Sequence, residues 1–152
     1  MRPYLIILTI ILAAGCDFIK TDKRRLDKAE EYKEFFYENR DTFEQLIKDI
    51  QVDKDMTDKM GLFQKVEKLQ DKEKVNTLTS LDIHMLTISE TNCDELEMEF
   101  ITSWTDYPIG QMYLTKDCSD EKSGKGNYWK DGFIEVWGLG EGWMIWIDSD
   151  PI

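Results

Sequence analysis

The chain has few of the side chains that most often carry out catalysis or hold metal ions. Its 152 residues include one histidine and three cysteines, and this histidine cannot form an ordinary zinc site once the cysteines are lipidated or paired in a disulfide. Positive charge is also scarce, because 19 lysine and arginine residues face 31 aspartate and glutamate residues, for a formal net charge of −12. Phosphate binding depends on clustered lysine and arginine. We therefore expect no nucleic-acid partner, no metal and no cofactor.

Long hydrophobic runs are absent as well. The longest apolar stretch, Tyr4 to Ala14, is interrupted only by Thr9, and it falls short of the about 20 residues that cross a bilayer as a helix. A run of this length, followed by small residues, is typical of the apolar core of a secretory signal. We expect residues 1–15 to be a signal peptide.

The end of this run, Leu12-Ala13-Ala14-Gly15-Cys16, resembles the lipobox of bacterial lipoproteins. The resemblance implies cleavage before Cys16, a diacylglycerol on its sulfur and a fatty acyl group such as palmitate on its new amino group. Ala13 departs from the commonest pattern, which has leucine there. The mature chain would begin with a lipidated tether, residues 16–22. Several acyl chains would hold it to the cell membrane or the outer membrane, facing the periplasm or the cell exterior. An ordinary secretory signal with a chance cysteine is the alternative.

Lipidation of Cys16 would leave Cys93 and Cys118 in a compartment where disulfides persist. Alternating residues predict strands over 96–104 and 109–115, and the sequence between them has turn chemistry. A hairpin folded about Asp106 brings the two cysteines close together. We therefore predict a Cys93–Cys118 disulfide that closes a loop of roughly 25 residues and contributes about 3 kcal/mol.

The rest of the chain predicts one α+β domain over residues 23–152. Apolar residues at helical spacing predict a long helix over 23–50 and a second over 58–70. Beyond residue 75 the pattern changes to strands, which we expect at 83–89, 96–104, 109–115, 133–138 and 143–148. This order indicates one or two N-terminal helices packed on an antiparallel sheet of four to five strands.

No catalytic constellation emerges from the sequence. The single histidine, His84, lies in a predicted strand, and no serine has a G-x-S-x-G motif around it. Three acidic residues cluster at Asp117, Asp120 and Glu121, but their spacing does not match the EF-hand calcium loop. We expect a solvated acidic loop there and leave weak calcium binding open.

Charge and tryptophan gather in the second half of the chain. Residues 76–152 hold four lysines against 15 acidic residues, and all five tryptophans. The glycine-rich segment 138–142 reads as the turn of a hairpin. If the turn centres between Gly140 and Glu141, one face of this hairpin is aliphatic and packs in the core, with Ile134, Val136, Trp143, Ile145 and Ile147. The opposite face then carries Phe133, Glu135, Trp137, Met144, Trp146 and Asp148.

Tryptophans edged with acids are typical of binding hot spots. The alternative is that these tryptophans fill the core under the helices or cover the other side of the sheet. The leading hypothesis is therefore a non-enzymatic envelope lipoprotein that binds a cationic protein through Glu135, Trp137, Trp146 and Asp148, as an inhibitor or an immunity protein. Small acidic lipoproteins of these kinds resemble this chain in general style only, without a shared motif.

Two other functions stay open at this point. The first is an assembly subunit of an envelope complex, whose long helix presents Phe35 and Tyr37 to a partner. The second is a small glycan or peptidoglycan hydrolase that uses two converging carboxylates; the candidates are Glu97, Glu99, Glu135 and Asp148. The oligomeric state does not follow from the sequence.

Overall fold

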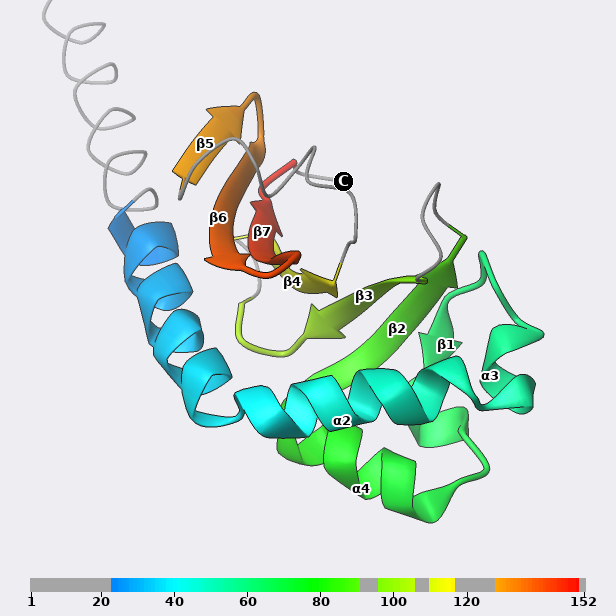
Figure 1. Cartoon of the computed structure of the whole chain (residues 1–152). Coiled ribbons are helices and arrows are strands. Elements are labelled where there is room, and N and C mark those ends of the chain that lie inside the picture. Colours follow the sequence, from blue (N-terminus) through cyan, green and yellow to red (C-terminus); the bar gives the residue numbers. More distant parts are fainter. Residues whose placement is uncertain (1–22, 91–95, 106–109, 117–127, 151–152) are drawn as a thin grey trace, which may run out of the picture.

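The computed structural model describes residues 23–90, 96–105, 110–116 and 128–150. It begins with helical residues 23–38, drawn in blue in Figure 1, and continues with α2 (Arg40–Gln51) and the short α3 (Lys54–Thr57). A 3-10 turn, η1 (Val66–Lys68), and α4 (Lys72–Ser80) follow. The strands are β1 (Gln64–Lys65), β2 (Ile83–Ser89), β3 (Glu97–Thr102), β4 (Gln111–Lys116), β5 (Tyr128–Asp131), β6 (Ile134–Gly140) and β7 (Trp143–Asp148).

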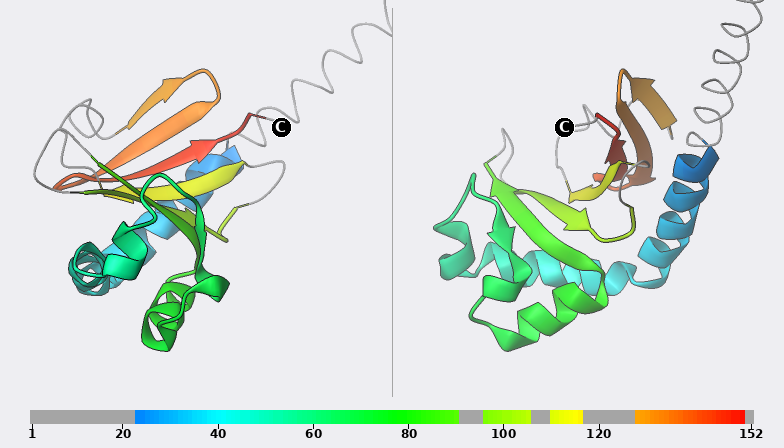
Figure 2. Two further views of the ribbon diagram at one scale, coloured as in Figure 1. Left: turned by 90° about the vertical axis from the view of Figure 1, so that its right-hand side faces the viewer. Right: turned by 180° about the vertical axis from the view of Figure 1, so that it is seen from behind.

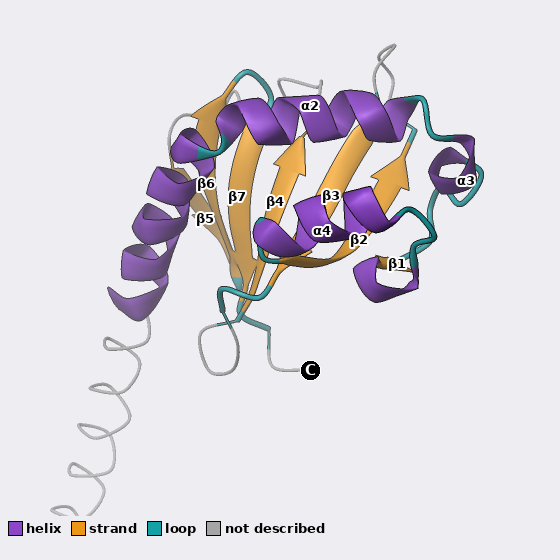
Figure 3. Ribbon diagram, turned by 90° about the horizontal axis from the view of Figure 1, so that it is seen from below, coloured by secondary structure: helices purple, strands orange, loops and turns teal. Residues whose placement is uncertain are grey.

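All seven strands belong to one antiparallel sheet with the order β1-β2-β3-β4-β7-β6-β5. Strands β1 to β4 are neighbours in the order of the sequence. Strand β5 forms the opposite edge of the sheet, and β6 and β7 follow inward from it, so that β7 pairs with β4. The sheet curls, and the helices lie on its convex side (Figures 1 and 2). Figure 3 looks onto this helix-covered face, with α2 and α4 across the strands and helix 23–38 beside β5 and β6.

Helix 23–38 and α2 are separated at Asn39, which ends one helix and begins the next. The side-chain Nδ2 of Asn39 donates a hydrogen bond to the carbonyl of Phe35 at 2.9 Å. Its own carbonyl accepts from the backbone N–H groups of Thr42 and Phe43 at the start of α2. Asparagine favours such local side-chain bonds. The long helix predicted over 23–50 is therefore two helices at an angle to each other (Figure 1).

The core lies between the helices and the convex face of the sheet. Helix 23–38 contributes Tyr32 and Phe36, and α2 contributes Phe43 and Ile50, all 0% exposed. The sheet supplies buried residues from its central strands to the same cluster: Leu86, Ile88, Met98, Phe100, Met112, Leu114, Trp143, Ile145 and Ile147. Alternate residues of each strand enter the core, as the sequence pattern predicts.

The predicted α+β class is confirmed, whereas the sheet has more strands than the expected four to five. Strands 83–89 and 143–148 match β2 and β7 at both ends. The helix predicted over 58–70 is wrong. Gly61 takes a φ of +76° there, and its N–H donates to the carbonyl of Ile88 on β2 at 2.8 Å. This bond and the pairing of β1 with β2 bring the segment to the sheet edge.

Candidate functional site

The four residues predicted to share one binding face lie on opposite faces of the sheet. In the β6–β7 pairing Val136 is opposite Trp146, and Ile134 is opposite Asp148. Directly paired residues of antiparallel strands share a face, and neighbours along a strand alternate. Trp146 and Asp148 therefore lie on the face of the sheet that is turned away from the helices, together with Ile134 and Val136. We call this face the open face. Trp137 and Glu135 lie on the helix-covered face, where they are 5% and 2% exposed.

The position of the hairpin turn explains why the predicted assignment of these residues to one face is wrong. The hairpin turns at Glu141 and Gly142, which have φ values of +53° and +79°, the conformation of a tight two-residue turn. The register also shifts between Gly138 and Gly140. The pairing is thus one residue away from that of a turn centred between Gly140 and Glu141, and such a shift exchanges the faces of one strand relative to the other.

Glu135 takes part in a buried ionic network. Its Oε1 accepts from Arg25 Nε at 2.8 Å and lies 3.0 Å from Lys130 Nζ, while its Oε2 accepts from the Tyr128 hydroxyl at 3.2 Å. Arg25 belongs to helix 23–38, so this carboxylate links the helix to β5 and β6. Glu135 and Asp148 do not converge in one cleft, because they lie on opposite faces of the sheet.

The centre of the open face is a pair of stacked aromatic rings. Tyr113 on β4 and Trp146 on β7 face each other in the register, with ring centroids 3.9 Å apart and planes at 5°. The indole N–H of Trp146 donates to Thr115 Oγ1 at 3.0 Å, which fixes the ring. Tyr113 is not among the residues that the sequence predicts for the binding face. Its contact with Trp146 depends on the pairing of β4 with β7, which no local pattern reveals.

Carboxylates flank this aromatic pair. Partial burial raises the pKa of the Tyr113 hydroxyl above its usual value, and the negative charges of Glu99 and Asp148 raise it further. In the described strands β1, β2, β3, β4, β7 and β6, the positions on the open face include the acidic residues Glu97, Glu99 and Asp148 and one lysine, Lys65, opposite Met85 at the β1 edge. The middle of this face is an apolar row that crosses the strands from β2 to β6: Met85, Ile101, Tyr113, Trp146 and Val136. Ile101 and Val136 are buried, whereas Met85, Tyr113 and Trp146 are partly exposed.

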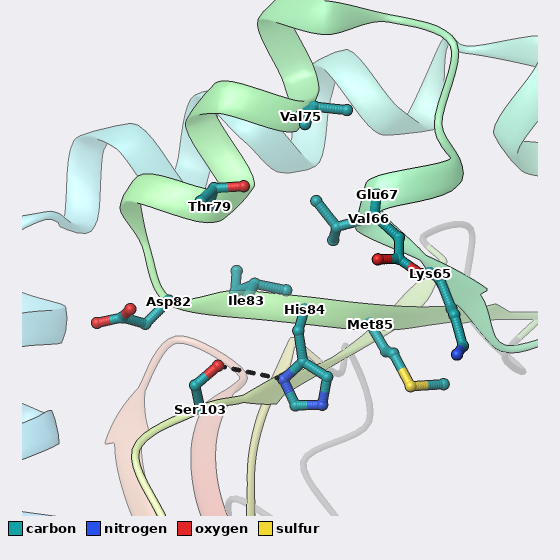
Figure 4. A pocket seen from close by; sticks show the side chains of 10 residues that line it. All are labelled: Lys65, Val66, Glu67, Val75, Thr79, Asp82, Ile83, His84, Met85 and Ser103. Atoms are coloured by element: carbon teal, nitrogen blue, oxygen red, sulfur yellow. Dashed lines mark hydrogen bonds between the residues drawn. The ribbon is translucent and has the colours of Figure 1, made fainter.

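A hollow of about 400 Å³ lies between η1, α4 and β2 (Figure 4). At its rim His84 Nδ1 lies 3.4 Å from Ser103 Oγ. Asp82 lies near them in sequence, but its side chain points away from both (Figure 4). The three residues therefore do not form a nucleophile–base–acid arrangement.

Phe35 and Tyr37, proposed as contacts for an assembly partner, have different environments. Phe35 is partly buried and packs its ring against Tyr32 and Trp104, with centroids 5.6 and 5.3 Å away. Tyr37 is 47% exposed and donates its hydroxyl to the carbonyl of Leu139 at 3.1 Å. The helix thus presents Tyr37 to solvent, whereas Phe35 belongs to the margin of the core.

Cys16, Cys93, Cys118 and the acidic segment 117–121 lie outside the described residues. Within the part of the chain that is described, no group of three histidine, cysteine, aspartate or glutamate side chains could hold a metal ion. In the same part, no helix combines the length and the apolar character that crossing a bilayer requires.

No known family model matches the sequence, and no curated protein or solved structure matches it either. The chain's own residues are therefore the basis for inferring its function.

Proposed function

We propose that the protein is a lipid-anchored, non-enzymatic protein of the cell envelope that binds a cationic protein through the open face of its sheet. The observation that supports this proposal is the stacked pair of Tyr113 and Trp146, flanked by Glu99 and Asp148 on a face that no described helix covers. The binding face differs from the one expected from sequence, because Glu135 and Trp137 are buried beneath the helices.

The chemistry of this face suits a partner segment that carries arginine or lysine. A guanidinium or ammonium group is attracted to the faces of tryptophan and tyrosine, and nearby carboxylates would pair with the same cation. Rigid aromatic rings also supply contact area at low entropic cost. The negative charge of the second half of the chain would steer such a partner and make association sensitive to salt. Blocking a cationic enzyme or toxin would make the protein an inhibitor or an immunity protein.

The anchor is the second part of the proposal, and it rests on the lipobox residues that end at Cys16. Fatty-acid labelling in the producing cell tests it directly. We expect the wild type to incorporate label and to fractionate with membranes, and Cys16→Ala to do neither. A Cys16→Ala variant that still incorporates label would contradict lipidation at this residue.

Capture from an envelope extract tests the binding face. The wild-type protein should retain a basic protein at low salt and release it at high salt. Trp146→Ala should weaken this retention about tenfold or more, as expected for a central aromatic contact. Glu99→Gln combined with Asp148→Asn should weaken it and also reduce its dependence on salt.

A matched control separates the local face from overall charge. Asp41→Asn combined with Asp49→Asn also removes two negative charges, but from α2, on the helical side of the molecule. We expect this variant to retain the partner as the wild type does. Equal retention by all the variants, each shown to be folded, would refute the open face as the binding surface.

A further inference from the structure

The loop before β1 displays apolar side chains to solvent. Between α3 and β1, Leu62 and Phe63 are each 62% exposed, and Met60 is 38% exposed. We call residues 59–65 the apolar tip. It lies at the end of α2 away from helix 23–38 (Figure 1). Neighbouring large apolar residues left in solvent by a soluble domain commonly mark an interaction site.

Hydrogen bonds hold the apolar tip in place on both sides of its exposed residues. The Gly61 N–H donates to the carbonyl of Ile88 on β2 at 2.8 Å, and the Leu62 N–H donates to the carbonyl of Lys59 at 3.2 Å. Gln64, which follows Phe63, is buried, and its Nε2 donates to the carbonyl of Met56 at 3.1 Å. The exposure of Leu62 and Phe63 is thus a consequence of the fold.

The charge of the apolar tip differs from that of the chain as a whole. Lys59 and Lys65 lie at its two ends, both exposed, and residues 59–65 contain no acidic side chain although the chain carries a net charge of −12. Apolar side chains between lysines suit the boundary between anionic headgroups and acyl chains. The lysines would repel a cationic protein, so the apolar tip suits a different partner from the acidic part of the open face around Glu99 and Asp148; Lys65 lies between the two, at the β1 edge of that face.

We propose that the apolar tip inserts Leu62 and Phe63 at the boundary between the headgroups and the acyl chains of an anionic bilayer, as a second membrane contact besides the lipid anchor. This inference rests on the anchor at Cys16 in the proposed function. A tether over residues 16–22 spans about 24 Å at most, which keeps the domain close to the bilayer surface. A second contact at the far end of α2 would limit rotation of the domain about its anchor.

Quenching of tryptophan fluorescence by brominated lipids tests this contact in the full lipoprotein. The protein is reconstituted in vesicles of equal parts phosphatidylcholine and phosphatidylglycerol, with or without bromine on the acyl chains. Phe63→Trp should be quenched more strongly than the parent protein, because its additional indole reaches the acyl chains. Asn76→Trp, at an exposed position on α4, is the matched control and should show no additional quenching.

Charge reversal of both lysines, Lys59→Glu with Lys65→Glu, should reduce the additional quenching of Phe63→Trp to less than half. Vesicle flotation of the wild type and of Cys16→Ser reports separately on the anchor. Intact flotation without additional quenching would overturn membrane insertion and favour a protein partner for the apolar tip. Absence of flotation by the wild type would overturn both the anchor and the apolar tip as membrane contacts. Retention of a basic protein by the open face is measured independently.

Discussion

Tyr113 and Trp146 stack on the open face of the sheet with ring centroids 3.9 Å apart and planes within 5° of parallel. The indole covers one side of the phenol ring, while Glu99 and Asp148 place negative charge nearby. Burial first, and these charges second, raise the pKa of the Tyr113 hydroxyl. The titration of Tyr113 is therefore a probe of the proposed binding face.

We expect Trp146→Ala to lower the pKa of Tyr113 toward its ordinary value, because the phenol becomes solvated. Glu99→Gln should lower it less, since charge is the smaller cause. Ultraviolet titration of tyrosinate measures both effects, with a Tyr113→Phe variant subtracted to remove the other five tyrosines. Trp104→Phe, which alters a ring beside Tyr32 and Phe35, should leave the Tyr113 titration unchanged. An unchanged pKa in Trp146→Ala would contradict the stacking.

The buried pair of Arg25 and Glu135 should matter for stability. Glu135→Ala leaves Arg25, whose side chain is 5% exposed, without this partner, and we expect the free energy of unfolding to fall by about 3 kcal/mol. Replacing both residues with methionine should cost less than Glu135→Ala, because no buried charge remains at the pair. Urea unfolding measures these changes. Glu31→Ala breaks an exposed ion pair with Lys28 on the same helix and should cost no more than about 0.5 kcal/mol.

The sequence predicted the strands more accurately than the relation between them. Strands 83–89 and 143–148 were found to the residue, because alternation and β-branched residues are local signals. Strands β1 and β5 have only two and four residues, too few for a periodic pattern, and they were missed. The break at Asn39 was missed because the apolar spacing continues through it.

The proposed binding face depends even more strongly on how the strands pair. A one-residue difference in register decides whether Trp137 and Trp146 share a face, and sequence alone left both registers available. The pairing of β4 with β7, which joins Tyr113 to Trp146, is a contact between distant segments. Of the four residues predicted to share one face, Trp146 and Asp148 lie on the open face, and Glu135 and Trp137 lie on the helix-covered face. The residues beside Trp146, such as Tyr113, are placed there by the order of the strands in the sheet.

Gly110, immediately before β4, has a φ of +114° and lies against the backbone at the end of β7. A Cβ at this position would collide with the carbonyl oxygen of Asp148. We expect Gly110→Ala to cost about 3 kcal/mol in urea unfolding, from steric overlap in addition to backbone strain. Gly132→Ala is the matched control, because its φ is +59° but its Cβ would meet nothing within 4 Å. That variant should cost only about 1 kcal/mol, and equal costs would argue against the close approach of β4 to β7.

Lys74 joins the starts of two helices. Its Nζ lies 2.8 Å from Asp53 Oδ2 and 2.9 Å from Asp71 Oδ2, and these aspartates are the N-caps of α3 and α4. Hydrogen bonds from Lys74 are the largest cause that lowers the pKa of each aspartate, and the bond to Asp53 is the largest cause that raises the pKa of Lys74. The three charges thus stabilise one another in the folded state.

Removal of this lysine should make stability less dependent on pH. Because the carboxyl pKa values are lowered by folding, their contribution is complete above the ordinary value of 3.8 and is lost as the pH falls through the lowered values. Because the Lys74 pKa is raised, its contribution is complete below 10.5 and is lost above it. We expect Lys74→Met to be less stable than the wild type between these limits, with the difference shrinking toward about pH 2. Urea unfolding across this pH range measures the difference in stability. The control is Lys72→Met, which neutralises an exposed lysine on the same helix. Its stability should differ little from that of the wild type, and the difference should barely vary with pH. A Lys74→Met deficit that persists undiminished in acid would mean that the side chain stabilises the helix junction by packing rather than by charge.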